Sequence, residues 1–310
     1  MTIVKFLDPK NDVAFRRIFG SEKNKDILIH FVNDILELKN GNKIREVTFL
    51  PTIQDPEISS KKQSIVDILC KDENGVQIIV EMQVSPQEGF EKRAQYYAAK
   101  AYSRQLNKGK AEGSRYIDLK SVIFIAISDS IVFKNKISYK SNHVILDKEN
   151  FSRDLRDFSF TFIELPKFKI TDLNLLTNII EKWCFFFKYA DETKGTDLTK
   201  IIGSDQVIER AYEELNQFNW TEEELLTYEQ ETKRVMDNRA AEDYLINIAK
   251  AEGETKGRTE GKKETKIKIA QRMLANGLSP TLISAITGLD KDFVISLINN
   301  KKLVTFLNLN

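Results

Sequence analysis

The carboxylates Asp67 and Glu81 stand on two neighbouring apolar segments of the sequence. Between these segments lies the sequence DENG at residues 72–75, which is typical of a tight turn, so the segments are predicted to form a β-hairpin. If the loop has three residues with Gly75 in the left-handed conformation, Asp67 lies directly opposite Glu81. Opposed side chains share one face, with Cβ atoms about 4.5–5.5 Å apart, so this register predicts a close carboxylate pair.

Such a pair predicts a metal site for phosphodiester hydrolysis. Like charges at this distance destabilise the fold unless a cation lies between them. Mg²⁺ prefers hard oxygen ligands and keeps several waters for a phosphate and a nucleophile, and Mn²⁺ shares the preference for oxygen. Gln83 projects from the same face as Glu81 and could orient a water. The expected catalytic residues are therefore Asp67, Glu81 and Gln83.

Two other arrangements of the hairpin remain open at this point. A four-residue loop would pair Asp67 with Val80 and place the two acids on opposite faces. Alternatively, both acids could face water on an edge strand, where charged side chains block further strand pairing. Neither alternative would bring Asp67 and Glu81 together around a metal ion.

The segments around the hairpin predict an α/β domain. Asp8 followed by Pro9 predicts a helix N-cap, and Asp12 shares one helix face with Phe15 and Phe19, toward the core, although a first-turn carboxylate favoured by the helix dipole is the alternative. The elements then expected are a helix at 25–36, strands at 45–50, 63–72 and 76–84, a helix at about 87–107, and strands at 121–129 and 160–165. The 121–129 strand is apolar on both faces and is expected in the centre of the sheet.

The C-terminal half predicts helices. We expect a first domain at residues 1–170, a helical region at 171–250 and a tail at 251–310. Gly253, Gly257 and Gly261 recur every four residues among charged residues, which predicts a marginal helix or tether, with a homodimer through close helix packing as the alternative.

The end of the tail resembles a helix-turn-helix. A helix is predicted to end at Gly277, a second to run from the N-cap Ser279 to Gly288, and a third to start at Asp290. A modest excess of Lys and Arg is compatible with weak phosphate binding. The last helix carries few groups able to contact base edges, so packing or self-association is as reasonable an expectation as sequence-specific DNA recognition.

Composition excludes several classes of protein. The chain has 310 residues with 41% hydrophobic and 30% charged residues, which excludes wholesale disorder, and the net charge of +1 means that DNA would be bound by local patches. No export signal or membrane-spanning run is evident, so a cytoplasmic protein without a membrane partner is expected. The two cysteines, Cys70 and Cys184, are expected to be reduced core residues, and two histidines are too few for a histidine metal cluster.

Asp67, Glu81 and Gln83, in the element order α, β, β, β, α, β, resemble the PD-(D/E)XK nuclease core in an E-x-Q variant. Segments in matching order resemble the recombination-promoting nuclease (Rpn) and transposase family over nearly the whole chain: DPKNDVAFRRIFG, SIVDILCKD, VEMQV, FEKRAQYYAAKAYSRQL and FTFIELPKF. The tail sequence ITGLDKDFVISL is also similar to the end of those proteins. Together these segments identify the chain as a member of that family.

This resemblance implies a metal-dependent endonuclease that cuts DNA with little sequence preference and is linked to recombination or transposition. Asp67 and Glu81 would bind Mg²⁺ with the carbonyl of Met82, and Asp12 would support the metal through water. Gln83 replaces the usual lysine and cannot act as a base, so it could position water by hydrogen bonds, or its presence could mean weak activity. A catalytically silent DNA-binding or assembly protein is the alternative.

Basic and aromatic residues near the hairpin are candidates for substrate binding. Arg93 and Tyr97 lie one turn apart on the predicted helix after the hairpin, where they could meet the scissile phosphate or orient the metal site. The alternative is that Tyr97 packs under the sheet while Arg93 is solvated. Lys61 and Lys62 could contact the DNA backbone, or they could be ordinary surface lysines.

Overall fold

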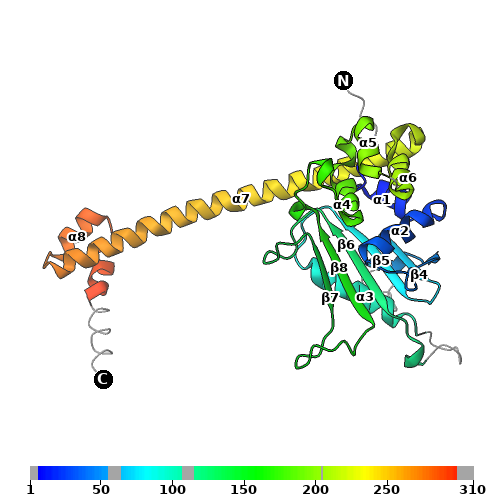
Figure 1. Cartoon of the computed structure of the whole chain (residues 1–310). Coiled ribbons are helices and arrows are strands. Elements are labelled where there is room, and N and C mark those ends of the chain that lie inside the picture. The colour runs from blue at the N-terminus through cyan, green and yellow to red at the C-terminus, as the bar shows by residue number, and fades with distance from the viewer. Residues whose placement is uncertain (1–5, 55–63, 107–114, 204, 299–310) are drawn as a thin grey trace. The chain divides into compact units, whose positions relative to one another are not determined.

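The computed structural model of the chain describes residues 6–54, 64–106, 115–203 and 205–298 (Figure 1). The chain forms two compact units, Met1–Val235 and Met236–Asn310. The first unit contains the sheet and the predicted site, and the second is helical in its described part. A functional division of the chain at residues 170 and 250 stays a prediction.

The first unit is built on a mixed six-stranded sheet in the order β1-β4-β5-β6-β8-β7. Its strands are β1 Val47–Phe49, β4 Ile68–Asp72, β5 Gln77–Gln83, β6 Val122–Ser128, β7 Lys140–Val144 and β8 Phe158–Glu164. β4 and β5 are antiparallel, whereas β5, β6 and β8 run parallel. The almost completely buried β6 lies inside the sheet, as its apolar sequence predicts.

The β4–β5 hairpin has the register predicted from a three-residue loop. Ile68 pairs with Val80, and the Asp72 N–H donates to the Val76 carbonyl at 3.0 Å. Gly75 has φ of +84°, in the left-handed region that favours glycine. The four-residue loop, which would have paired Asp67 with Val80, is therefore wrong.

Helices cover both faces of the sheet. The helices of the first unit before α7 are α1 Asp12–Phe19, α2 Lys25–Ile35, α3 Phe90–Ser103, α4 Ile179–Tyr189, α5 Gly195–Ile202 and α6 Gln206–Leu215. Residues 68, 70, 78 and 80 belong to the hydrophobic cluster formed with α1, α2, α4 and α6, which includes buried Cys70 and Cys184. Residues 69 and 79 belong instead to the cluster that packs under α3. Since side chains alternate along a strand, Glu81 and Gln83 on β5 fall on the α3 face, whereas Asp67 directly precedes β4.

Some predicted boundaries were wrong. The N-cap of α1 is Asn11, whose side chain accepts the Val13 N–H, whereas Asp8 accepts the Lys10 N–H at 2.9 Å in the preceding turn. The 63–72 segment divides into β3 Ser64–Ile65 and β4, and β3 pairs with β2 Ile53–Gln54 in a separate two-stranded sheet. The edge strand β7 escaped prediction because its sequence, KSNHV, lacks apolar alternation.

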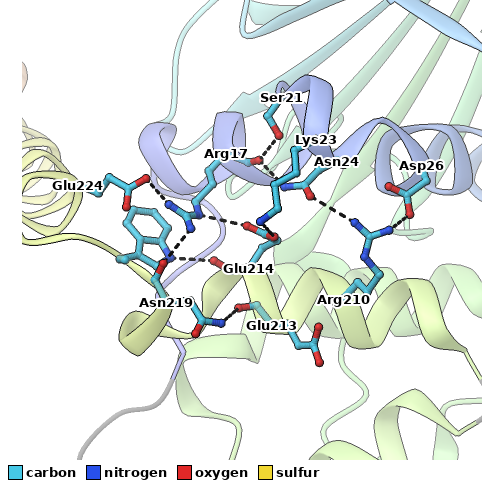
Figure 2. A network of polar contacts seen from close by, with 11 residues as sticks. Arg17, Ser21, Lys23, Asn24, Asp26, Arg210, Glu213, Glu214, Asn219 and Glu224 are labelled. Carbon is cyan, nitrogen blue, oxygen red and sulfur yellow. Dashed lines mark hydrogen bonds and ion pairs between the residues drawn. The ribbon is translucent and has the colours of Figure 1, made fainter.

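A polar network joins α1 to the helical segments that follow residue 205 (Figure 2). Arg17 donates to Glu214 at 3.2 Å, to the Asn219 carbonyl at 3.1 Å and to Glu224, and its guanidinium lies 4.5 Å from the Trp220 ring centroid. These partners come from α6, from the 3₁₀ helix Gln217–Asn219 and from the start of α7 Glu222–Ala275. The network therefore fixes α1, which carries Asp12, to helices about 200 residues later in the chain.

The second unit contains the predicted three-helix end. The last turns of α7, α8 Pro280–Thr287 and residues 291–298 pack around Ala270, Ile283 and Val294. Ser279 caps α8 by accepting the Leu282 N–H, and Gly288 ends it in the left-handed conformation, as predicted. Residues 253–261 lie within continuous α7. Among the described residues, no helix is both long enough and apolar enough to span a membrane.

Candidate active site

Hydrogen bonds across the hairpin connect Asp67 with Glu81 and with the next residue, Met82. The Asp67 N–H donates to Glu81 Oε2 at 3.1 Å, and the Met82 N–H donates to Asp67 Oδ2 at 2.8 Å. Glu81 lies on β5, inside the sheet, and is only 6% exposed. The alternative that Glu81 faces water on an edge strand is therefore wrong, and the predicted closeness of the two carboxylates is confirmed.

Burial raises the pKa of both carboxyl groups. Burial, with a contribution from the nearby negative charge of Asp12, raises the pKa of Asp67 to about 6. Burial, together with the charge of Asp67, raises the pKa of Glu81 to about 8. Two acids that repel each other in a poorly hydrated position gain stability from a cation at their free oxygens.

Arg93 approaches this pair from α3. Its Nη2 lies 3.6 Å from Glu81 Oε1, and its guanidinium also donates to the side-chain oxygens of Gln83 and Gln87. The Arg93 side chain is only 27% exposed, and its guanidinium stacks over Phe90, 5.0 Å from the ring centroid. The alternative of a solvated Arg93 is therefore wrong.

Gln83 is held at both ends of its amide. Its Nε2 donates to the Ser85 carbonyl at 2.5 Å, and its Oε1 accepts from Arg93. Gln83 thus lies beside Glu81, as predicted, but its polar atoms are engaged with the protein. Its expected role in orienting water stays a prediction and would require one of these hydrogen bonds to open.

Tyr97 is partly buried and packs against the hydrophobic cluster under α3. Its ring centroid lies 5.8 Å from the Arg93 guanidinium, and burial raises the pKa of its hydroxyl. Packing under the sheet, the second possibility for Tyr97, is therefore confirmed. A substrate contact by Tyr97 stays a prediction, and Lys61 and Lys62 lie outside the described residues.

Asp12 and Arg16 complete the site from α1. The Arg16 Nη2 lies 3.3 Å from Asp12 Oδ2 and 3.5 Å from Asp67 Oδ1. Asp12 therefore lies near the carboxylate pair, as expected, and is linked to it through Arg16. Sequence reasoning missed Arg16, although its spacing of four residues from Asp12 is that of an ion pair along a helix.

The free oxygens of Asp67 and Glu81 suit a hard divalent cation, but they supply only part of its coordination shell. Asp67 and Glu81 each use one oxygen for a backbone N–H, which leaves the other for a metal. In the described part of the chain, no three or more His, Cys, Asp or Glu residues are grouped closely enough to hold a metal. Water and substrate would therefore complete the shell, which is the usual coordination of Mg²⁺ at phosphates.

A mixed sheet flanked by helices, with a carboxylate pair on its central hairpin, is the architecture of a PD-(D/E)XK nuclease fold. Residues 9–244 match the family model described as PD-(D/E)XK nuclease family transposase, and residues 263–297 match that of the Rpn/YhgA-like nuclease family, C-terminal HTH domain. The chain belongs to the PD-(D/E)XK nuclease family transposases, and the predicted Rpn resemblance is confirmed. No curated protein and no solved structure matches the chain significantly.

Proposed function

We propose that the chain is a Mg²⁺-dependent DNA endonuclease that hydrolyses phosphodiester bonds at the Asp67–Glu81 pair with little sequence preference. The observation that carries this proposal is the pair itself: Glu81 is buried and accepts the Asp67 N–H, and the largely buried Asp67 accepts the Met82 N–H. A purely structural role is a poor explanation, because an uncompensated acidic pair at this depth costs stability. The family description as a nuclease family transposase supports a role in transposition, to which we add recombination as part of the proposal.

Asp67 and Glu81 would hold the metal, and Mn²⁺ could replace Mg²⁺. A bound divalent ion would polarise the phosphodiester and lower the pKa of the attacking water. The hydrogen bonds from the Asp67 and Met82 N–H groups fix one oxygen of each carboxylate, so both side chains are oriented before substrate binds. Arg93 holds Glu81 and Gln83 together on the same side of the hairpin.

A catalytically silent DNA-binding protein is the second candidate, favoured by one observation. Gln83 stands where this fold usually has lysine, and its amide is occupied by Ser85 and Arg93. Glutamine cannot take a proton from water at neutral pH. The nuclease proposal therefore requires water to be activated by the metal without a base at residue 83.

Nicking of supercoiled plasmid by the full chain tests the two candidates. Asp67→Asn and Glu81→Gln keep the side-chain shape, and each should lower the rate of nicking about a thousandfold or more. The matched control is Glu73→Gln, which removes an exposed acid at the hairpin turn and should leave the rate unchanged. Wild-type cleavage should occur with Mg²⁺ or Mn²⁺ and stop with EDTA.

Other outcomes of the same assay decide against the proposal. Nicking that persists in EDTA or in both site variants would place the activity elsewhere. A wild-type chain that binds DNA but is inert with both metals would favour the silent binding protein. Joined strands, rather than nicks, would indicate a transposase that also transfers strands.

The helical tail would support DNA binding and self-association. The HTH match covers residues 263–297. Gly253, Gly257 and Gly261 lie on an exposed part of α7, where a Cβ added to any of them would meet no described atom within 4 Å outside its chain neighbours and the adjoining helix backbone. We propose that this part of α7 pairs with a second copy, and a monomeric mass by light scattering of the full chain would refute this.

A further inference from the structure

We propose that Arg16 is an exchangeable cation of the site, pairing with Asp67 and Asp12 in the metal-free protein and with a DNA phosphate once a metal is bound. This role rests on the proposed nuclease function, which it extends by a substrate-binding residue. Arg16 comes from α1, whereas the other substrate-binding candidates, Arg93 and Tyr97, come from α3.

The position of Arg16 puts it in competition with a metal. Asp67 Oδ2 accepts the Met82 N–H, so Oδ1 is the oxygen left for a cation. Arg16 Nη2 lies 3.5 Å from this Oδ1. A divalent ion bound through Oδ1 would therefore take over the charge that now pairs with Arg16.

Arg16 is also much less restrained than Arg93. Its side chain is 46% exposed against 27% for Arg93, and with the described residues it forms ion pairs of 3.3 Å to Asp12 and 3.5 Å to Asp67. Arg93, in contrast, donates to two amide oxygens and stacks on Phe90. The Arg16–Asp12 pair is exposed at both ends and contributes little stability, and a bound divalent ion would replace Arg16 as the partner of Asp67, so the Arg16 side chain can then leave at small cost.

Release of Arg16 would not require α1 to move. The neighbouring Arg17 anchors that helix through Glu214, Glu224 and the Trp220 ring. The freed guanidinium would remain at the rim of the carboxylate pair, where the substrate phosphate must approach. A guanidinium forms paired hydrogen bonds with phosphate oxygens, which a lysine ammonium does not reproduce.

Two measurements on the full chain test this role without relying on cleavage. The first is calorimetric titration with Mn²⁺ in the absence of DNA, where Arg16→Gln should tighten binding about two- to fivefold because a competing charge is removed. The second is DNA affinity in Ca²⁺ as a function of salt, where Arg16→Gln should weaken binding and reduce the slope of log K against log salt by about 0.9. Arg16→Lys should keep the slope but bind DNA less tightly than wild type.

Arg45→Gln is the matched control. It removes the same charge from an exposed residue near the hairpin turn, at the other end of β4 from Asp67, and should leave Mn²⁺ affinity and salt slope unchanged. If Arg16 were only a structural link between α1 and the hairpin, Arg16→Gln would weaken Mn²⁺ binding or leave it unchanged, and that result overturns the proposal. Failure of the wild type to bind Mn²⁺ would instead overturn the proposed nuclease function together with this role.

Discussion

Removing the charge of Glu81 should stabilise the metal-free protein at alkaline pH. In Glu81→Gln the amide oxygen can still accept the Asp67 N–H, so the hairpin contact is preserved. The variant no longer has to keep an ionised carboxylate buried beside Asp67. A substitution that should abolish activity is therefore expected to increase the free energy of unfolding.

The size of the effect follows from the raised pKa of Glu81. Its pKa rises from the ordinary 4.5 to about 8 in the folded protein, so the folded state holds the proton more tightly than the unfolded chain. Stability from this group is complete below about pH 4.5 and is lost as the pH rises through about 8. At about 1.4 kcal/mol for each unit of pKa difference, wild type should lose roughly 4–5 kcal/mol that Glu81→Gln retains.

Urea unfolding in EDTA, followed by tryptophan fluorescence, measures this difference. Trp183 and Trp220 are the only tryptophans and both belong to the unit that contains the site, so the signal reports that unit alone. The two proteins should be equally stable at pH 4.5 and separate progressively up to pH 9. Added Mg²⁺ should stabilise wild type but have a much smaller effect on Glu81→Gln.

Glu164→Gln is the control, because it is expected to lower the free energy of unfolding, whereas Glu81→Gln is expected to raise it. Glu164 is also fully buried, but it accepts the Val132 and Phe133 N–H groups and pairs with Lys167 at 2.6 Å. Glu164→Gln leaves the buried Lys167 without its carboxylate partner and should lower the free energy of unfolding by about 3–5 kcal/mol. If Glu81→Gln also proved less stable than wild type at pH 9 in EDTA, the reasoning on buried charge at the site would be refuted.

Three further sets of substitutions test the framework of the two units. Gly75→Ala should destabilise the first unit by about 1 kcal/mol in urea, because its φ of +84° strains other residues and the new Cβ would lie 3.3 Å from Lys120 Cγ. Arg17→Met should cost about 2–3 kcal/mol, because Arg17 is 19% exposed and joins two carboxylates, whereas Arg234→Met, at an exposed residue, should cost under about 1 kcal/mol. Alanine at residues 253, 257 and 261 favours the isolated helix by about 1 kcal/mol per residue but obstructs close packing of two copies, so the full chain should become monomeric by light scattering.

Local sequence signals predicted the hairpin turn and the limits of the helix α8 in the tail. The DENG sequence predicted the turn, and of the two loop lengths considered, the three-residue loop that the structure has places Asp67 beside Glu81. Ser279, Pro280 and Gly288 likewise determined the limits of α8. In each case the relevant contacts join residues close in sequence, so turn and cap preferences limited the possibilities to a few, and the structure decided the loop length of the hairpin.

Long-range contacts explain what the sequence did not predict. Arg16 acquires its place in the site only because α1 meets the hairpin in three dimensions, 51 residues away from Asp67. The engagement of Gln83 by Arg93 likewise depends on how α3 crosses the sheet. A sequence pattern assigns residues to a helix face, but it does not say which other element will cover that face.

The helices after the sheet help to position the site, although none of them supplies a carboxylate to it. Asp12 and Arg16 are placed by α1, and α1 packs against α2 and α6 while Arg17 binds Glu214 and Glu224. Loss of these later helices would leave α1 free to move away from the hairpin. The family match running to residue 244, well beyond the last strand at Glu164, agrees with a fold in which sheet and helices are one structural unit.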